Sequence, residues 1–180
     1  MSKYLDLLSA CSRKQRSLLF RLVSLFLGSA LFLVIFPAAL IRLAKFLSTP
    51  VNIDWPRPTE LLVASVSTVI GLSFLTWAVV SHWVIGKGTP APVAPPQRLI
   101  VAGPYKLCRN PIQLGLILYY LGLGTLWYSL STGLVSFMIA LIVGGLYHKL
   151  VEEKELLIRF GEDYERYRER TPFLIPRFRR

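Results

Sequence analysis

Four long apolar runs constrain this chain more than any other feature of its sequence. They cover residues 18–41, 61–84, 112–128 and 134–150. A helix needs about 20 mostly apolar residues to cross the hydrocarbon core of a bilayer, and each run approaches that length. The pattern predicts an all-α membrane protein with about four transmembrane helices. Arg21 lies near the end of the first run, where its long side chain can reach the headgroups.

The composition agrees with a single membrane domain over residues 1–180, because 53% of the residues are hydrophobic and the mean hydropathy is +0.50. A net charge of +11 in a soluble protein would suggest nucleic acid as a partner. Here the lysines and arginines lie mainly between and outside the apolar runs. That placement favours anionic lipid headgroups over nucleic acid.

The two cysteines, Cys11 and Cys108, both lie in basic stretches, and no CxxC spacing is present. This arrangement predicts neither a structural disulfide nor a metal site. The first apolar run follows a basic segment but is longer than the roughly 7–15 residues of a signal-peptide core. We therefore expect a retained membrane anchor.

The cations also predict the orientation of the chain in the membrane. The amino-terminal tail, residues 86–110 and the carboxy-terminal tail are rich in Lys and Arg, whereas residues 129–133 carry no charge. Both termini are therefore expected in the cytoplasm. The first outer loop also holds cations, and a short amphipathic extension after Pro37 would account for Arg42 and Lys45.

The chain is expected to divide into an N-terminal two-helix anchor, residues 1–85, and a second region, residues 86–180. Prolines exclude a helix or central strand at residues 89–96, which predicts an extended strap. The short link at residues 129–133 predicts an antiparallel helix hairpin. Small residues that would let helices approach closely there are Gly115, Gly122, Gly124, Gly144 and Gly145.

Beyond residue 150 the composition changes abruptly to a mixture of acidic and basic residues. The last membrane helix is expected to continue over residues 152–160 and to stop near Gly161. A second short helix over residues 162–170 would follow and end at Thr171-Pro172. The sequence therefore predicts a helical cytoplasmic tail.

The first motif with possible chemistry is Gly103-Pro104-Tyr105, followed by Arg109-Asn110-Pro111. Asn-Pro is typical of a helix start, and the free backbone amides of a helix start next to Arg109 can bind an anion such as a carboxylate. An ordinary capped helix with Arg109 on a lipid phosphate explains the same residues equally well.

The second motif is the adjacent pair Glu152-Glu153 at the end of the last apolar run. Carboxylates at a membrane boundary are often functional, and these could hold an ammonium group or a ribose hydroxyl. A solvated helix face, with Glu153 near Lys149 and Glu155 near Arg159, is the more common arrangement.

An aromatic stripe at Phe160, Tyr164 and Tyr167 could wall an adenine pocket if the helix continues through Gly161, although packing is the more common role of such a stripe. His82 and His148 are candidate bases at the ends of apolar runs. No GxSxG, P-loop, HExxH or GxGxxG pattern occurs, so hydrolase, nucleotidase, zinc-protease and soluble Rossmann functions have no support.

Taken in order, several motifs resemble one family. They are GKGTPAP (86–92), GPY (103–105), RNPIQLG (109–115), the Glu152-Glu153 pair, FGEDYERY (160–167), Pro172 and IPR (175–177). The family is the isoprenylcysteine carboxyl methyltransferases and phospholipid N-methyltransferases of membranes. The resemblance covers about the last half of the chain. It implies a helix hairpin and a cytoplasmic tail that fold together around S-adenosylmethionine, near a membrane-facing opening for a lipid-like acceptor.

The resemblance also implies site residues. Arg109 would be the polar residue closest to the chemistry, and the cofactor would contact Gly103, Pro104, Tyr105, Asn110, Pro111, Gln113, Glu152, Glu153, Tyr164 and Tyr167. The family commonly has His at the position of Asn110 and Tyr at the position of Gln113. A proton-accepting imidazole is therefore lost at 110, which argues against copying the prenylcysteine acceptor.

The predicted function is S-adenosylmethionine-dependent methyl transfer to a membrane-embedded or lipid-like acceptor with a carboxylate, amine or similar nucleophile. Two alternatives stay open on the sequence. One is an NADPH-dependent membrane reductase, and the other is a non-catalytic membrane subunit or lipid-binding scaffold.

Overall fold

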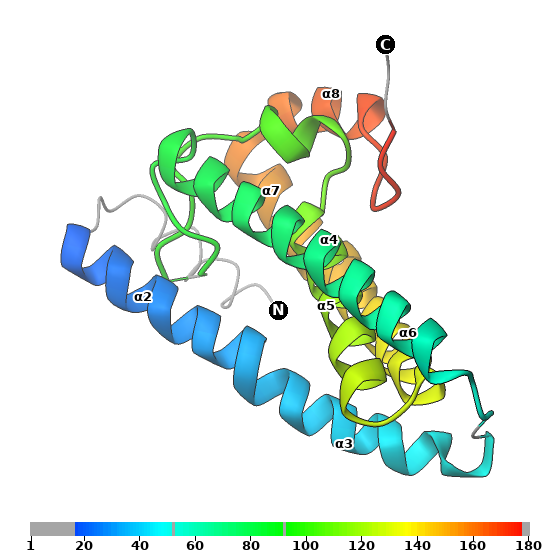
Figure 1. The fold of residues 1–180 in the computed structure, drawn as a ribbon. Coiled ribbons are helices and arrows are strands. Elements are labelled where there is room, and N and C mark those ends of the chain that lie inside the picture. The colour runs from blue at the N-terminus through cyan, green and yellow to red at the C-terminus, as the bar shows by residue number, and fades with distance from the viewer. Residues whose placement is uncertain (1–16, 52, 92, 178–180) are drawn as a thin grey trace. The chain divides into compact units, whose positions relative to one another are not determined.

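The computed structural model describes residues 17–51, 53–91 and 93–177. All the regular secondary structure of these residues is helical, and turns and loops connect the helices (Figure 1). Three features of the sequence lie outside the described residues: the basic residues near the amino terminus, Cys11, and Pro92 of the strap. The chain forms two compact units. The first unit comprises residues 1–29, 76–111 and 147–180, and the second unit comprises residues 30–75 and 112–146.

The first apolar run forms one continuous helical segment of 31 residues, Leu18–Ser48. It consists of α2 (Leu18–Ala30), a π-helical turn η1 (Leu31–Ile35) and α3 (Phe36–Ser48). Pro37, at the start of α3, has no N–H to donate. The turn before it is wider than an α-helical turn, because the Phe36 N–H donates to Leu31 O, five residues earlier. The predicted extension after Pro37 is confirmed, because α3 continues through Arg42 and Lys45.

Among the described residues, three segments are long and apolar enough to cross a membrane: Leu18–Ser48, Arg57–Val84 and Leu130–Phe160. The second is α4 (Arg57–Val84), and the third joins α6 (Leu130–Tyr147), the π-helical turn η4 (His148–Glu152) and α7 (Glu153–Phe160). These spans make the chain a membrane protein.

The remaining apolar helix, α5 (Pro111–Trp127), has 17 residues. At 1.5 Å per residue it is about 26 Å long, somewhat less than the roughly 30 Å core of a bilayer. The fold therefore provides three helices of spanning length and one shorter apolar helix, where the sequence predicted about four spans.

In the second unit, α5 and α6 form the predicted antiparallel hairpin. The amide of Gln113 donates to Ala140 O over 2.7 Å, and farther along a Cβ built on Gly124 would lie 2.9 Å from the Cα of Gly133. The link between α5 and α6 is shorter than the predicted residues 129–133. Because α6 already begins at Leu130, Gly133 belongs to the helix and lies against α5.

The glycines divide between two packing surfaces, which the sequence could not separate. A Cβ on Gly115 would lie 2.8 Å from Gly71 O, and one on Gly122 would lie 2.8 Å from Ala64 O, so both glycines face α4. A Cβ on Gly145 would meet nothing within 4 Å. Only part of the glycine pattern therefore serves the hairpin.

The proline-rich segment of the first unit has no helix or strand among its described residues, as predicted, but it is not extended. The Thr89 N–H donates to Ala94 O over 2.8 Å, and the Gln97 N–H donates to Gly86 O over 2.7 Å. The buried hydroxyl of Thr89 also donates to Ala94 O. These bonds close the segment into a loop. Prolines keep the segment out of helices and sheets, and turn hydrogen bonds satisfy its backbone groups instead.

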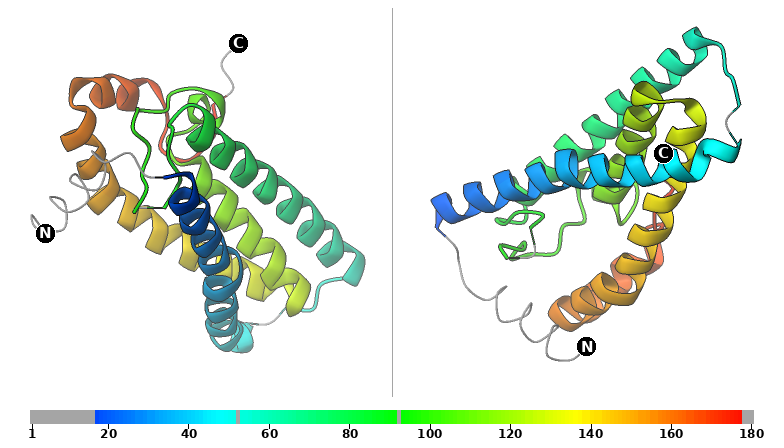
Figure 2. Two further views of the ribbon diagram at one scale, coloured as in Figure 1. Left: turned by 90° about the vertical axis from the view of Figure 1, so that its left-hand side faces the viewer. Right: turned by 90° about the horizontal axis from the view of Figure 1, so that it is seen from below.

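The tail of the first unit follows the prediction closely. The α7 helix ends at Gly161, which has a φ of +54°, and α8 (Glu162–Arg170) follows. This break means that Phe160 and Tyr164 do not lie on one continuous helix. The predicted adenine pocket required a helix that continues through Gly161, and that condition is not met. In Figures 1 and 2 the orange and red tail lies beside the green segment around residues 100–110 of the same unit.

Candidate functional site

The Gly-Pro-Tyr motif forms a short turn of 3₁₀ helix, η3 (Gly103–Lys106), against the end of α4. Gly103 has a φ of +63°, and a Cβ there would lie 2.9 Å from Ser81 Oγ, so both conformation and space require glycine. The turn buries the ring of Tyr105, whose hydroxyl shares a 2.6 Å hydrogen bond with Nε2 of His82. The motif thus serves as a tight turn that delivers one aromatic side chain into the unit.

Tyr105 also contacts the tail. Its carbonyl accepts a 2.7 Å hydrogen bond from the Tyr167 hydroxyl. Burial raises the pKa of Tyr105 well above its ordinary value, and the negative charge of Glu152 adds to the effect. The phenol therefore stays neutral and able to hydrogen-bond throughout the physiological pH range.

Arg109 and Glu153 form the central ion pair of this unit. Nη1 of Arg109 donates to Oε1 of Glu153 over 2.6 Å, and the two side chains are 13% and 19% exposed. The anion that Arg109 contacts in this structure is a carboxylate of the chain itself. The partner of Glu153 is Arg109 rather than Lys149. Nε of Arg109 is buried and has no acceptor among the described residues.

The tail beyond α8 is held against the segment that precedes α5. The Arg109 N–H donates to Pro172 O over 2.9 Å, and the Asn110 side-chain amide donates to Phe173 O over 2.9 Å. The Arg177 N–H donates to Leu107 O over 3.0 Å. Asn110 therefore serves as a clamp for the tail, and Pro111 begins α5 as predicted.

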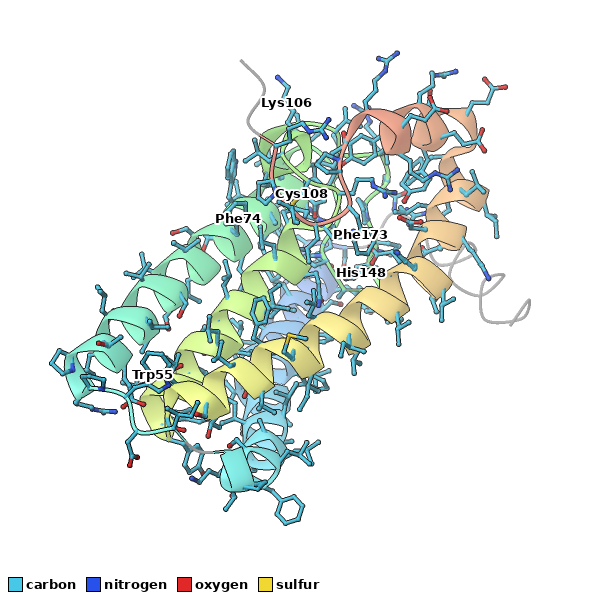
Figure 3. All side chains as sticks on the ribbon, turned by 90° about the vertical axis from the view of Figure 1, so that its right-hand side faces the viewer. Trp55, Phe74, Lys106, Cys108, His148 and Phe173 are labelled. Carbon is cyan, nitrogen blue, oxygen red and sulfur yellow. The ribbon has the colours of Figure 1, made fainter. Side chains whose placement is uncertain are left out.

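Phe173 is a site residue that sequence reasoning missed. The Arg109 guanidinium lies 5.6 Å from the centroid of its ring, and the Lys149 ammonium lies 5.4 Å from it. Figure 3 labels Phe173, together with Cys108 and His148. No spacing rule links residue 173 to residue 109, so only the fold reveals this contact.

Glu152 and the two histidines are less isolated than the sequence suggested. Glu152 hydrogen-bonds to Nδ1 of His148 one helical turn earlier, while His82 reaches Tyr105. The predicted pair of Glu155 and Arg159 is confirmed at 2.9 Å. The described residues contain no group of three or more His, Cys, Asp and Glu side chains that could hold a metal ion.

The two tyrosines of α8 enter the same cluster. Tyr164 is buried, and its ring centroid lies 6.3 Å from that of Tyr167. Burial raises the pKa of both hydroxyls, and for Tyr164 the charge of Glu153 raises it further while Arg109 opposes the change. Both phenols are thus neutral packing and hydrogen-bonding groups.

Gln113 is the one predicted site residue outside the first unit. It is buried in the second unit, where its amide is bound to Ala140 O, and a Cβ on Gly144 would collide with it. The first unit holds all the others: Gly103, Pro104, Tyr105, Arg109, Asn110, Pro111, Glu152, Glu153, Tyr164 and Tyr167.

Comparison with known proteins gives two partial similarities. No protein-family model matches the chain, and no solved structure matches it. A cobalt-zinc-cadmium resistance protein, CzcN of Cupriavidus metallidurans, is 36% identical over 81 residues, which cover 44% of this chain and 36% of that protein. Methanethiol S-methyltransferase 2 of Bradyrhizobium diazoefficiens is 33% identical over 75 residues, 41% of this chain and 27% of that protein. The matches thus span about a third of each relative's length, and over two fifths of its own length this membrane chain is similar to a methyltransferase.

Proposed function

We propose that this chain transfers a methyl group from S-adenosylmethionine to a membrane-embedded or lipid-like acceptor, as a member of the isoprenylcysteine carboxyl methyltransferase and phospholipid N-methyltransferase family. The observation that carries the proposal is the similarity to a methanethiol S-methyltransferase. The clamped tail of the first unit supports it, because it gathers the motifs that the resemblance assigned to cofactor binding.

The residues present suit this cofactor. Its carboxylate requires a cationic donor, and Nε of Arg109 is buried without an acceptor among the described residues. Its ammonium group and ribose hydroxyls require acceptors, which Glu152 offers beside His148. The ring of Tyr167, which is partly exposed, offers an apolar surface for adenine, while Tyr164 is buried and packs beside it.

Bound S-adenosylmethionine supplies a methyl group that its positive sulfur already activates for attack. The protein then needs chiefly to hold the two reactants in line, and alignment alone can supply much of the rate. The Arg109–Glu153 pair gives the site a fixed frame, and Phe173 covers the guanidinium from one side. Arg109 would orient the acceptor or the carboxylate of the cofactor in that frame.

The nature of the acceptor follows from the bases that the site offers. A carboxylate is nucleophilic at neutral pH, whereas an amine or a thiol must first lose a proton. Asn110 cannot remove that proton, because an amide is no base and its nitrogen is bound to Phe173 O. A carboxylate acceptor would need no base, and for an amine or a thiol the candidate base in this unit is His148, beside Glu152. Cytoplasmic termini, as the cations favour, would place the site where the soluble cofactor is made.

Binding to the intact purified protein in detergent tests the proposal. Calorimetry should show saturable S-adenosylmethionine binding, weakened by Arg109→Gln and by Glu152→Gln. The matched control is Arg166→Gln, because Arg166 is an exposed cation of α8 that pairs only with its own helix. Binding of NADPH with no binding of S-adenosylmethionine would support the reductase, and binding of neither would support the scaffold.

Membranes that contain the protein can then be incubated with methyl-labelled cofactor to identify the acceptor. Label should appear in a lipid, a quinone, a small molecule or a protein terminus with the native chain and be lost with Arg109→Gln. Unchanged labelling with this variant would contradict the role of Arg109.

A further inference from the structure

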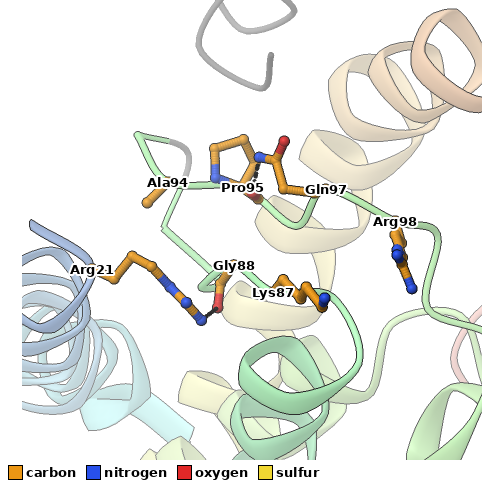
Figure 4. Close-up of a pocket in the computed structure, with 7 residues that line it drawn as sticks. All are labelled: Arg21, Lys87, Gly88, Ala94, Pro95, Gln97 and Arg98. Carbon is orange, nitrogen blue, oxygen red and sulfur yellow. Dashed lines mark hydrogen bonds between the residues drawn. The ribbon is translucent and has the colours of Figure 1, made fainter. Parts of the chain in front are cut away.

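A basic cavity of about 370 Å³ lies in the first unit, between the start of α2 and the proline-rich loop (Figure 4). Its lining includes three cations, Arg21, Lys87 and Arg98. No acidic residue is among the described residues that line it. The volume falls within the range of ordinary small-molecule sites. Three positive charges around one cavity repel one another, and a bound anion would relieve that repulsion.

Arg21 is fixed at the wall of this cavity. Its guanidinium lies 4.0 Å from the centroid of the Trp83 ring. Nη2 donates to Gly88 O over 3.3 Å, and a dashed line in Figure 4 marks this bond. Nε of Arg21 is buried and has no acceptor among the described residues. A buried donor without an acceptor costs free energy, and an acceptor atom of a bound ligand would remove that cost.

Lys87 is an independent indication of a ligand. It has a φ of +52°, a strained conformation for a residue with a side chain, although glycine occupies both neighbouring positions. The loop is tight at this point, since a Cβ on Gly88 would lie 2.5 Å from the Cα of Pro96. A glycine at 87 would remove the strain. Strain retained at a cationic side chain in a cavity wall is typical of a functional site.

The ends of the candidate spans would place the cavity at the depth of lipid headgroups. Arg21 is in the first turn of the Leu18–Ser48 span, and Lys87 follows the Arg57–Val84 span by three residues. Exposed apolar side chains continue on both spans from these points, with Leu22 48% exposed and Val84 66% exposed. An anionic group held at this position would have acyl-chain surface beside it.

We propose that this cavity binds a phosphate group, with the headgroup of an anionic phospholipid as its source. Arg21 and Lys87 would contact the phosphate oxygens, and Arg98 would add charge at the opening. The site is separate from the residues that we assign to methyl transfer. Its function would be to anchor the proline-rich loop to the membrane surface.

The test uses the intact protein in detergent and three soluble probes: dioctanoyl phosphatidic acid, dioctanoylglycerol and inorganic phosphate. Thermophoresis should show saturable binding of phosphatidic acid that weakens as salt rises. Dioctanoylglycerol, which has the same chains without phosphate, should not bind. Competition by inorganic phosphate at equal concentration would assign the site to free phosphate, whereas its failure to compete would assign it to the lipid headgroup.

Two variants and one control complete the experiment. Lys87→Gly removes a cation and relieves the strain, so we expect an unchanged or higher melting temperature with about tenfold weaker binding of phosphatidic acid. Arg98→Gln should also weaken binding. Lys106→Gln removes an exposed cation outside the cavity lining and should leave binding unchanged. Equal binding of dioctanoylglycerol and phosphatidic acid, or full affinity in Lys87→Gly, would overturn the proposal.

Discussion

At the residue scale, the ion pair between Arg109 and Glu153 is the contact on which the candidate site depends. Both side chains are mostly buried, so removing either partner leaves the other charge without compensation. We expect Arg109→Gln and Glu153→Gln each to lower the free energy of unfolding by about 2–4 kcal/mol. The double variant should lose less than the sum of the two single losses.

Thermal unfolding in detergent, followed by circular dichroism, measures these effects. The Arg166→Gln variant is the control, because its partners Glu162 and Asp163 are exposed, and its melting temperature should not change measurably. Strictly additive losses in the double variant would show that Arg109 and Glu153 do not interact.

Cys108 supports a prediction about reactivity. Its thiol is fully buried, and burial raises its pKa to about 11. Since the thiolate is the reactive form, iodoacetamide at pH 8 should modify folded Cys108 far more slowly than the unfolded chain. Mass spectrometry of a Cys11→Ser variant measures this rate for Cys108 alone. Rapid modification without denaturant would contradict the burial of the thiol.

The same shift has a consequence for stability. The folded state keeps Cys108 neutral up to a pKa of about 11, whereas the unfolded thiol ionises near 8.5. The contribution of this group is therefore complete below about pH 8.5 and is lost progressively as the pH rises toward 11. Unfolding at pH 7 and pH 10, compared between the Cys11→Ser protein and a Cys11→Ser/Cys108→Ala variant, should show a smaller pH dependence in the second.

Some residue-scale features were readable from the sequence, and others were not. Gly103 and Pro111 could be predicted, because a turn and a helix start depend on neighbouring residues. The hydrogen-bond acceptor of Asn110 could not be predicted, since Phe173 O is 63 residues away. Every residue has a backbone carbonyl, so no residue type marks the one that accepts. Local geometry is thus encoded visibly, whereas the pairing of distant segments is not.

At the scale of elements, the close approach of α5 and α6 depends on particular glycines. A Cβ on Gly124 would lie 2.9 Å from the backbone of Gly133, so one helix would have to shift. We expect Gly124→Ala to cost about 1–3 kcal/mol in spite of the better helix propensity of alanine. Thermal unfolding in detergent measures the loss.

Gly145→Ala is the matched control for the hairpin. Gly145 lies within α6, and an added Cβ there would meet nothing within 4 Å. The substitution should leave the melting temperature unchanged or raise it. Equal effects of the two substitutions would mean that α5 and α6 do not pack at Gly124.

Element boundaries show where sequence patterns reach their limit. The break at Gly161 was predictable, because its positive φ suits glycine. The start of α6 was not, because Leu130 at its first position has its N–H bound by the carboxylate of Glu60 over 2.8 Å. Glu60 directly precedes the apolar run 61–84 in the sequence, yet it is buried and satisfies a helix start 70 residues away.

At the scale of the whole molecule, the topology depends on α5. Three crossings would put the two ends of the chain on opposite sides of the membrane, and four would put them on the same side. The cation pattern favours four, with both ends in the cytoplasm. We therefore expect a green fluorescent protein to fluoresce when fused to either end, and alkaline phosphatase to be active when inserted at Tyr128–Ser129. Fluorescence at one end only would show that α5 does not cross.

The count of spans illustrates what composition can and cannot supply. Apolar length predicted runs at residues 18–41, 61–84 and 134–150, because burial in lipid is a property of each helix by itself. These runs lie within the segments Leu18–Ser48, Arg57–Val84 and Leu130–Phe160. The helix α5 is too short for the same argument to hold. Its position in a bilayer depends on its contacts with other helices, through residues such as Gly115 and Gly122, which hydropathy does not measure.

The clamp between residues 172–177 and residues 107–110 also bears on how the protein is made. The apolar helices of the described residues all precede residues 172–177 in the chain, so they are synthesised before Phe173. Until then Asn110 lacks its acceptor, and Arg109 lacks both the aromatic cover and the carbonyl of Pro172. The helices can therefore enter the membrane before the polar cluster is assembled, and the candidate site would form only after residues 172–177 have left the ribosome.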